Sequence, residues 1–469
     1  MLFLASLAGA ADFTKIVKLS EQMLSSSERQ LIDDPRPIPN NPKKFLPPAV
    51  YKRYTYDIDK MEALQAEAVG FKAPDRVGKI APEITPGKYT YQDKAGKPGL
   101  KELMIPLVYE RLFRQSGPPY AGTYSEFEVV PTRQSYYCQP FLEATLKNKE
   151  KTRQDPQGYM EWQTYKGGIP FPMPSGSDRI KAMQVIYNWE TNYWGTDSQL
   201  LPTLSYSWDK NFKKMSESLT YTMRTIAIGR MTDAPMPYLD DRAKQLSEFR
   251  LSLAPSLRPR DAYGNVTKAE FTLDPLQPHK VYAYAAALRR VRKMTGSDSQ
   301  DVTMGTNAIL DDGGGFLRKL SPNLYPYEYK LLAEREYLVP TFFVPGDNLY
   351  VSSKDKAFHN MKMERRPLYV IELIQKDSAY IYGRTILYID QETFELFWNE
   401  SYDQKGRLFR AVYNIDLLVP EMGIKTALIS PSYDFQAQQS SLGFYSVPVP
   451  LTDISRADYN IGKMQNFVK

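Results

Sequence analysis

The sequence is poor in cysteine and histidine, the residues that most often carry thiol chemistry and zinc coordination. Among 469 residues there is one cysteine, Cys138, and there are two histidines, His279 and His359. One thiol cannot form an internal disulfide, and these counts exclude zinc sites of the Cys/His type. They also disfavour a nucleophile–histidine triad. We therefore expect no catalytic residue, no metal and no cofactor, and a protein that is not an enzyme.

Long apolar runs and a strong charge excess are also missing. No run of the sequence is apolar over the length needed to cross a bilayer as a helix. The 60 basic and 54 acidic residues give a formal charge of +6. Over this length the excess is too small to indicate nucleic acid as a partner, although it permits peripheral contact with an anionic surface.

Aromatic residues and proline, by contrast, are abundant. The 34 tyrosines favour strands, and the 35 prolines break helices. Five helices are nevertheless predicted, mainly from apolar spacing: 14–31, 57–68, 101–115, 141–151 and 178–192. The predicted strands are 219–231, 249–253, 281–292, 325–339 and a closing meander. The expected fold class is mainly β with α, built on one large antiparallel sheet with helices on one side.

The first residues, MLFLASLAGAADF, resemble the end of a secretory signal. A mostly apolar stretch precedes Ala8-Gly9-Ala10, which fits a cleavage site of small residues before Ala11. A buried N-terminal segment is the alternative. We expect residues 1–10 to be a signal remnant, 11–100 an N-terminal helix with a proline-rich extension, and 101–469 the main domain. The expected location is the periplasm.

The meander from Arg366 to Asn414 carries apolar residues on both faces. The turn after Asp390 is expected to pair Leu387 with Leu396, and a turn with Gly406 in the left-handed conformation to place Val412 opposite Trp398 and Arg410 opposite Glu400. This register predicts that one face gathers six apolar residues: Leu387, Ile389, Phe394, Leu396, Trp398 and Val412. Such a face forms either the wall of a ligand cavity or a core covered by a helix.

Charged clusters elsewhere allow several interpretations. The densest basic cluster comprises Arg289, Arg290, Arg292 and Lys293. It could bind nucleic acid, but a charged sheet edge, or a surface for a partner or anionic head groups, fits the strand pattern better. Neighbouring acidic residues such as Asp240 and Asp241 could serve glycoside hydrolysis only if their separation in space allowed it. Both histidines are expected at the surface.

Five segments together resemble the exported bacterial family defined by domain of unknown function 1329 (DUF1329), which is related to outer-membrane lipoprotein-sorting proteins of the LolA/LolB type. They are Gly168–Pro174, Arg289–Lys293, Lys330–Pro340, Tyr382–Thr393 and Tyr402–Leu408. Two positions depart from the family pattern. Asn188-Trp189 is not followed by histidine, and Ala286-Ala287-Leu288 stand where the family has Pro-Gly-Gln. No catalytic residue is carried over from the family.

The resemblance implies a half-open β-barrel with helices that plug or cover a hydrophobic concavity. It also implies a carrier of lipids or acyl chains that works with a transporter of the resistance-nodulation-division class or with an outer-membrane protein. Two other hypotheses stay open: a non-catalytic module that bridges transporter and outer membrane, and a hydrolase of envelope glycans or lipids.

Overall fold

The computed structural model describes residues 41–294, 300–301, 306–312, 319–460 and 462. The expected signal remnant, residues 1–10, and the helix expected over 14–31 lie outside them. The strands are β1 (Gly87–Thr90), β2 (Glu126–Val129), β3 (Ser198–Trp208), β4 (Lys214–Ile226), β5 (Glu248–Arg258), β6 (Val266–Thr272), β7 (Lys280–Ala285), β8 (Arg290–Lys293), β9 (Tyr327–Pro340), β10 (Tyr350–Val351), β11 (Phe358–His359), β12 (Lys362–Gln375), β13 (Tyr382–Asp390), β14 (Leu396–Asp403), β15 (Leu408–Tyr413), β16 (Ile415–Val419), β17 (Ile424–Asp434), β18 (Gln439–Tyr445) and β19 (Val449–Pro450).

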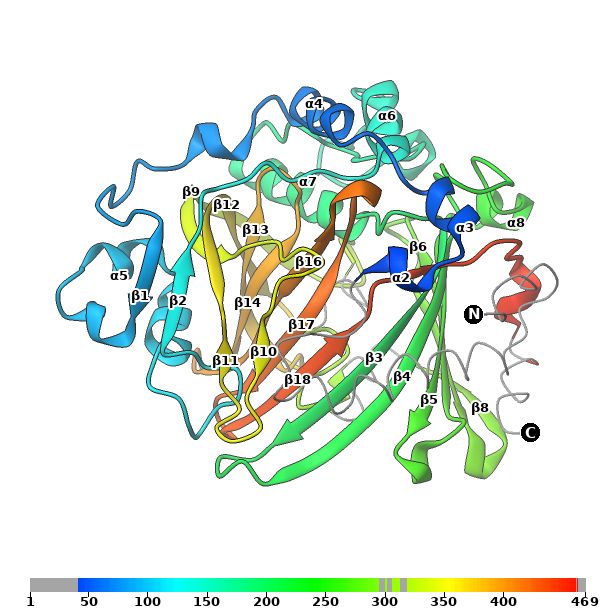
Figure 1. Cartoon of the computed structure of the whole chain (residues 1–469). Coiled ribbons are helices and arrows are strands. Elements are labelled where there is room, and N and C mark those ends of the chain that lie inside the picture. The colour runs from blue at the N-terminus through cyan, green and yellow to red at the C-terminus, as the bar shows by residue number, and fades with distance from the viewer. Residues whose placement is uncertain (1–40, 295–299, 302–305, 313–318, 461, 463–469) are drawn as a thin grey trace.

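Seventeen of these strands form one sheet, and β10 with β11 forms a separate hairpin. The main run of paired strands is β8-β7-β6-β5-β4-β3-β18-β17-β15-β14-β13-β12-β9. These pairs are antiparallel, and β2 joins β12 in parallel. The sheet curls without closing, because its edge strands β8 and β9 lie on opposite sides of the molecule (Figure 1). This confirms the expected fold class.

The described α-helices are α2 (Pro42–Phe45), α3 (Pro48–Arg53), α4 (Ile58–Val69), α5 (Gly99–Leu103), α6 (Gln139–Asn148), α7 (Asp178–Glu190) and α8 (Asp241–Gln245). Helices α4, α6 and α7 lie together over one end of the curled sheet, at the top of Figure 1. Local signals set the start of two of them: the side chains of Asp57 and Ser177 accept hydrogen bonds from the backbone of the first turn of α4 and α7.

Two predicted elements are wrong. The helix expected over 101–115 is replaced by the short α5 and a separate turn at 108–112, because Pro106 cannot continue the backbone hydrogen bonding. The single strand expected over 281–292 is replaced by the hairpin of β7 and β8. The chain turns between them, and Arg289 at this turn has a left-handed backbone with φ of 50°.

The sheet has two buried faces, which we name by what lies on them. The α7 face carries Tyr369 and is covered by α7, whose Lys181 pairs with Glu334 of β9 at 2.5 Å. The tryptophan face carries Trp398, whose register partners are Tyr388 and Tyr413. In the meander from β12 to β15, most residues on both faces are buried, so this part lacks the wet, polar surface that an antiparallel sheet usually keeps. The expectation that the meander is apolar on both faces is therefore confirmed.

The expected register of the meander is wrong, although its second turn is confirmed. Gly406 has the predicted left-handed conformation, with φ of 75°. A bulge between Ser401 and Tyr402 then shifts the pairing by one residue, so Arg410 faces Ser401. A second bulge, between Tyr388 and Ile389, leaves Phe397 of β14 without a partner on β13, so Leu387 pairs with Asn399 and Trp398 lies on the face opposite Leu396. A one-residue shift moves a side chain to the opposite face of a sheet.

Candidate functional site

Five of the six residues predicted to form one wall do share a face. Strand alternation places Leu387 and Ile389 together on the α7 face. Leu396 pairs with Ile389, Phe394 stacks on Tyr369 at 6.4 Å, and Val412 pairs with Asn399, the partner of Leu387. All five are buried. Their contact with a ligand stays a prediction.

Trp398 lies on the opposite face, in an aromatic core. Its ring centroid is 5.6 Å from that of Tyr413 and 6.4 Å from that of Tyr433. Its indole N–H donates to Glu400 Oε2 at 2.8 Å, and the Tyr402 hydroxyl donates to the other carboxylate oxygen at 2.9 Å. Trp398 is fully buried. Its placement with the other five residues on one wall is therefore wrong, for the register reason given above.

A small cavity opens on the α7 face, between the C-terminal end of α7 and strands β5 and β6. Its volume is about 30 Å³, enough for one or two water molecules. The lining combines apolar side chains with basic ones: Met160, Tyr187, Glu190, Thr191, Phe249, Arg250, Phe271, Thr272, Leu273, His279, Lys319 and Leu320. Apolar walls with a few placed polar groups are typical of small-molecule sites.

Arg250 projects from β5 onto the α7 face, where it pairs in register with Phe271 of β6. Its guanidinium carbon lies 4.5 Å from the ring centroid of Phe271 and 5.8 Å from that of Phe249. The side chain keeps some accessible surface because it borders the cavity, yet it lies deep in the protein. This burial lowers the pKa of Arg250 to about 10.

His279 and Lys319 supply two further nitrogens. His279 Nδ1 accepts a hydrogen bond from the backbone N–H of Thr272 at 3.1 Å, which leaves the ring proton on Nε2. Burial lowers the pKa of His279 well below its usual range, so the ring is neutral near pH 7. Lys319 Nζ donates to the carbonyl oxygens of Thr272 and Gln277 at 2.9 and 2.6 Å.

A second buried arginine lies one strand away on the same face. Arg224 of β4 pairs in register with Ser252 of β5, two residues from Arg250. Its guanidinium lies over the ring of Trp194. When the side-chain amide of Gln199 is oriented with its oxygen toward Arg224, this oxygen accepts hydrogen bonds from Nε of Arg224 at 2.6 Å and from Nη2 at 2.8 Å. Burial lowers the pKa of Arg224 well below its ordinary value. This part of the α7 face therefore carries two arginines.

Burial lowers the pKa of Lys319 to about 7, which makes stability depend on pH. An unfolded lysine titrates near 10.4, so between pH 7 and 10 the unfolded chain binds more protons than the folded one. The free energy of unfolding should therefore rise with pH in this range, by about 2 kcal/mol from pH 7 to 9 for this group. Urea unfolding at both pH values should show this gain in the wild type and in the exposed control Lys293→Met, and a smaller gain in Lys319→Met. An equal gain in all three would contradict the assignment.

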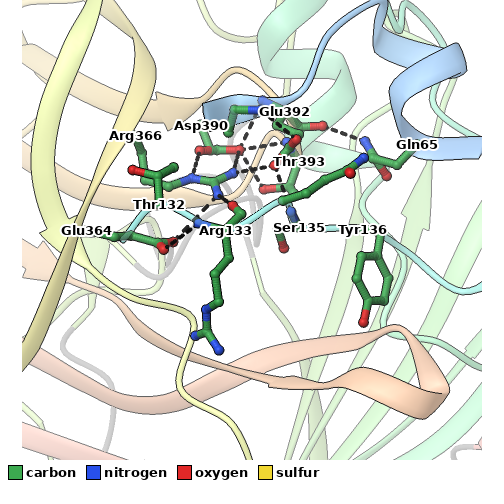
Figure 2. Close-up of polar contacts among 12 residues, drawn as sticks. Gln65, Thr132, Arg133, Ser135, Tyr136, Glu364, Arg366, Asp390, Glu392 and Thr393 are labelled. Carbon is green, nitrogen blue, oxygen red and sulfur yellow. Dashed lines mark hydrogen bonds and ion pairs between the residues drawn. The ribbon is translucent and has the colours of Figure 1, made fainter. Parts of the chain in front are cut away.

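A second polar cluster lies on the tryptophan face, and Figure 2 shows its contacts. Arg366 of β12 forms two hydrogen bonds with Asp390, at 2.7 and 2.9 Å, and one with Glu392 at 2.8 Å. Its third nitrogen donates to the carbonyl oxygen of Arg133 at 2.8 Å and lies 3.5 Å from Glu364. These four charged side chains are no more than 1% exposed.

This cluster links distant parts of the chain. Glu392 accepts backbone hydrogen bonds from Ala73 and Ser135, and its own carbonyl oxygen accepts from Gln65 of α4 (Figure 2). Burial raises the pKa of Glu392 to about 7 and also raises the pKa of Glu364. With no opening toward solvent, the cluster joins the helical end to the sheet and is a structural element.

The remaining candidates lie apart from the cavity. Arg289, Arg290, Arg292 and Lys293 are all exposed on the β7–β8 hairpin at the sheet edge. This fits a charged edge, and their contact with a partner or with head groups stays a prediction. Asp240 caps α8 and pairs with Arg456. His279, expected at the surface, lines the cavity instead.

Sequence reasoning missed Arg250, Arg224 and Lys319. No local signal marked the first two, because each arginine occupies the polar phase of a strand that alternates polar and apolar residues, as in a sheet with one solvated face. Lys319 precedes Leu320 in a connection without regular structure, and nothing local marks it.

Within the described ranges, no group of three or more His, Cys, Asp and Glu residues could hold a metal ion. In the same part of the chain, no helix is both long and apolar enough to span a membrane.

Comparison with known proteins places the chain among proteins whose function is not known. The family model described as "Protein of unknown function (DUF1329)" matches residues 119–455. An uncharacterized protein of Pseudomonas aeruginosa is 22% identical over 300 residues, which cover 62% of each chain. The chain thus spans less than two thirds of that relative's length.

Two solved structures are similar in part. A DUF1329 family protein from Desulfovibrio piger is 14% identical, with a TM-score of 0.45, and the match covers 62% of this chain and 100% of the other. A domain from Vibrio parahaemolyticus, whose name refers to outer membrane lipoprotein sorting, is 13% identical, with a TM-score of 0.43. That match covers 61% of this chain and 98% of the other.

Proposed function

This chain belongs to the DUF1329 family, and we propose that it works in the periplasm as a binding or carrier protein for a lipid or other hydrophobic molecule. The observation that carries the proposal is the cavity between α7 and an unclosed sheet, with its mainly apolar wall and its few basic groups. An amphiphile needs both kinds of lining.

The ligand's apolar part would lie against the α7 face of the sheet. Leu387, Ile389 and Val412 belong to this face, as do Arg250 and Phe271 of the cavity, because the strand register is continuous between them. Each buried methylene contributes about 0.8 kcal/mol, so a chain of ten methylenes would gain about 8 kcal/mol of binding energy before ordering costs.

Entry would require α7 to separate from β9, since a cavity of about 30 Å³ has no room for an acyl chain. The contact between these elements includes the ion pair of Lys181 and Glu334, whose side chains are 20% and 35% exposed. Partly exposed ion pairs contribute at most about 1 kcal/mol. The ion pair therefore adds little to this contact, and the main cost of opening is the exposure of buried α7 side chains such as Met183 and Ile186.

The test is to purify the protein natively from an envelope fraction and to identify bound small molecules by mass spectrometry. We expect lipid in stoichiometric amount with the wild type and with Leu246→Glu, a control at an exposed leucine. Leu387→Glu, which puts a charge on the α7 face, should lose the lipid while its circular dichroism stays native. Lipid no more abundant than on an unrelated exported protein would overturn the proposal.

A further inference from the structure

The cavity is lined by a partly buried cation, Arg250, whose N–H groups have no hydrogen-bond partner in the described part of the chain. Among the residues that the structure describes, no hydrogen bond or ion pair reaches the guanidinium of Arg250, which contacts the rings of Phe249 and Phe271. A guanidinium has five N–H donors and cannot lose its charge under ordinary conditions. The carboxylate of Glu190 interacts with Arg250 electrostatically, yet donors withdrawn from water without hydrogen-bond partners remain costly. The arrangement therefore favours a bound anion.

The neighbouring donors surround the same space. Lys319 Nζ uses two of its three N–H groups on backbone carbonyl oxygens, which leaves one for a ligand. The Nε2–H of His279 is the donor side of a ring whose other nitrogen is already bonded. All three side chains line the cavity.

The charges of the lining indicate how much negative charge a ligand would bring. The cavity is lined by two cationic side chains, Arg250 and Lys319, and by one carboxylate, Glu190, which interacts electrostatically with both. Burial lowers the pKa of Lys319 to about 7, and an anion beside it favours the protonated form, so the balance of these three groups with an anion bound is one positive charge. A group with a single negative charge, such as a carboxylate or a phosphodiester, would neutralise it.

We propose that this cavity binds the singly charged acidic head group of an amphiphile, with Arg250, Lys319 and the Nε2–H of His279 as the donors. The inference rests on the proposed carrier function and adds the class of ligand. The cavity volume of about 30 Å³ fits the oxygens of one such group. Phe249, Phe271 and Leu273 then contact the first methylenes of the chain.

The experiment compares two probes that differ only in the head group: cis-parinaric acid and its methyl ester, both fluorescent when bound in apolar surroundings. The wild type should bind the acid at least tenfold more tightly than the ester. Arg250→Met should bind the acid about tenfold to hundredfold more weakly, the usual loss for a hydrogen bond to a charged group, and the ester unchanged. Arg258→Met, at the far end of the same strand, is the matched control and should behave as the wild type.

Each remaining outcome has a distinct meaning. If neither probe binds and no lipid co-purifies, the carrier function itself fails. If both probes bind equally and Arg250→Met changes neither, the carrier function stands and the acidic head group is overturned. Inorganic phosphate that binds in calorimetry with an affinity equal to that of the acid would overturn the amphiphile in favour of a free anion. Lys319→Met provides a second variant should Arg250→Met fail to fold.

Discussion

Replacing Arg366 with methionine is expected to lower the free energy of unfolding by about 3–5 kcal/mol. The change removes the only guanidinium inside the cluster and leaves Asp390, Glu392 and Glu364 buried without it. Carboxylates cut off from water and from their counter-ion must either bind protons or draw water into the core. Urea unfolding followed by circular dichroism measures the loss.

The control is Arg384→Met. Arg384 also pairs with a glutamate, Glu372, but its side chain is 43% exposed, and pairs of this kind contribute at most about 1 kcal/mol. In the Arg366→Met background, adding Asp390→Asn and Glu392→Gln should recover part of the lost stability, because the stranded charges are then gone. If Arg366→Met costs no more than Arg384→Met, the cluster does not hold the helical end to the sheet.

Replacing Trp398 with alanine should cost about 3–5 kcal/mol of unfolding free energy. The indole fills space between Tyr413 and Tyr433, and its loss also takes the N–H donor from Glu400. Because Trp398 lies on the face away from the cavity, binding of a hydrophobic probe by the folded fraction should not change. Thermal unfolding and probe titration on the same sample separate the two effects.

A comparison with Val412→Ala makes this test specific. Val412 is also buried but lies on the α7 face, so its truncation should cost about 1–2 kcal/mol and should weaken probe binding. The single six-residue wall inferred from the sequence requires both variants to weaken binding alike. Unchanged binding in Val412→Ala, with weakened binding in Trp398→Ala, would place the ligand on the tryptophan face.

Local sequence signals were enough for several parts of the fold. Asp57 and Ser177 mark helix starts through their side-chain oxygens, and Gly406 marks a turn through its left-handed backbone. Each signal acts within a few residues of itself. The sequence also predicted that both faces of the meander are apolar. A sheet with one solvated face alternates polar and apolar residues, and a sheet buried on both sides does not.

The predictions that were wrong, and the residues that were missed, depend on contacts between distant parts of the chain. The bulge after Ser401 moves Arg410 to face Ser401, and no residue type there demands it. Arg366 hydrogen-bonds to Asp390 and to Arg133, which are 24 and 233 positions away in the sequence. The cavity likewise joins Arg250, His279 and Lys319 from three separate segments. Such groupings depend on strand order, which no local pattern encodes.

The two free edges of the sheet bear on how the protein behaves at high concentration. Strand β8 ends the sheet with exposed Arg290, Arg292 and Lys293, so two copies that approached edge to edge would repel each other. Strand β9 is much longer, and among the described residues one backbone bridge, from Met104 to Leu338, reaches its outer edge. Two further segments lie against β9: the backbone N–H groups of Gly78 and Lys79 donate to Glu336, and Arg335 donates to the carbonyl oxygen of Glu102 in α5. The N-terminal segments that pack on β9 therefore also limit edge-to-edge pairing of two copies.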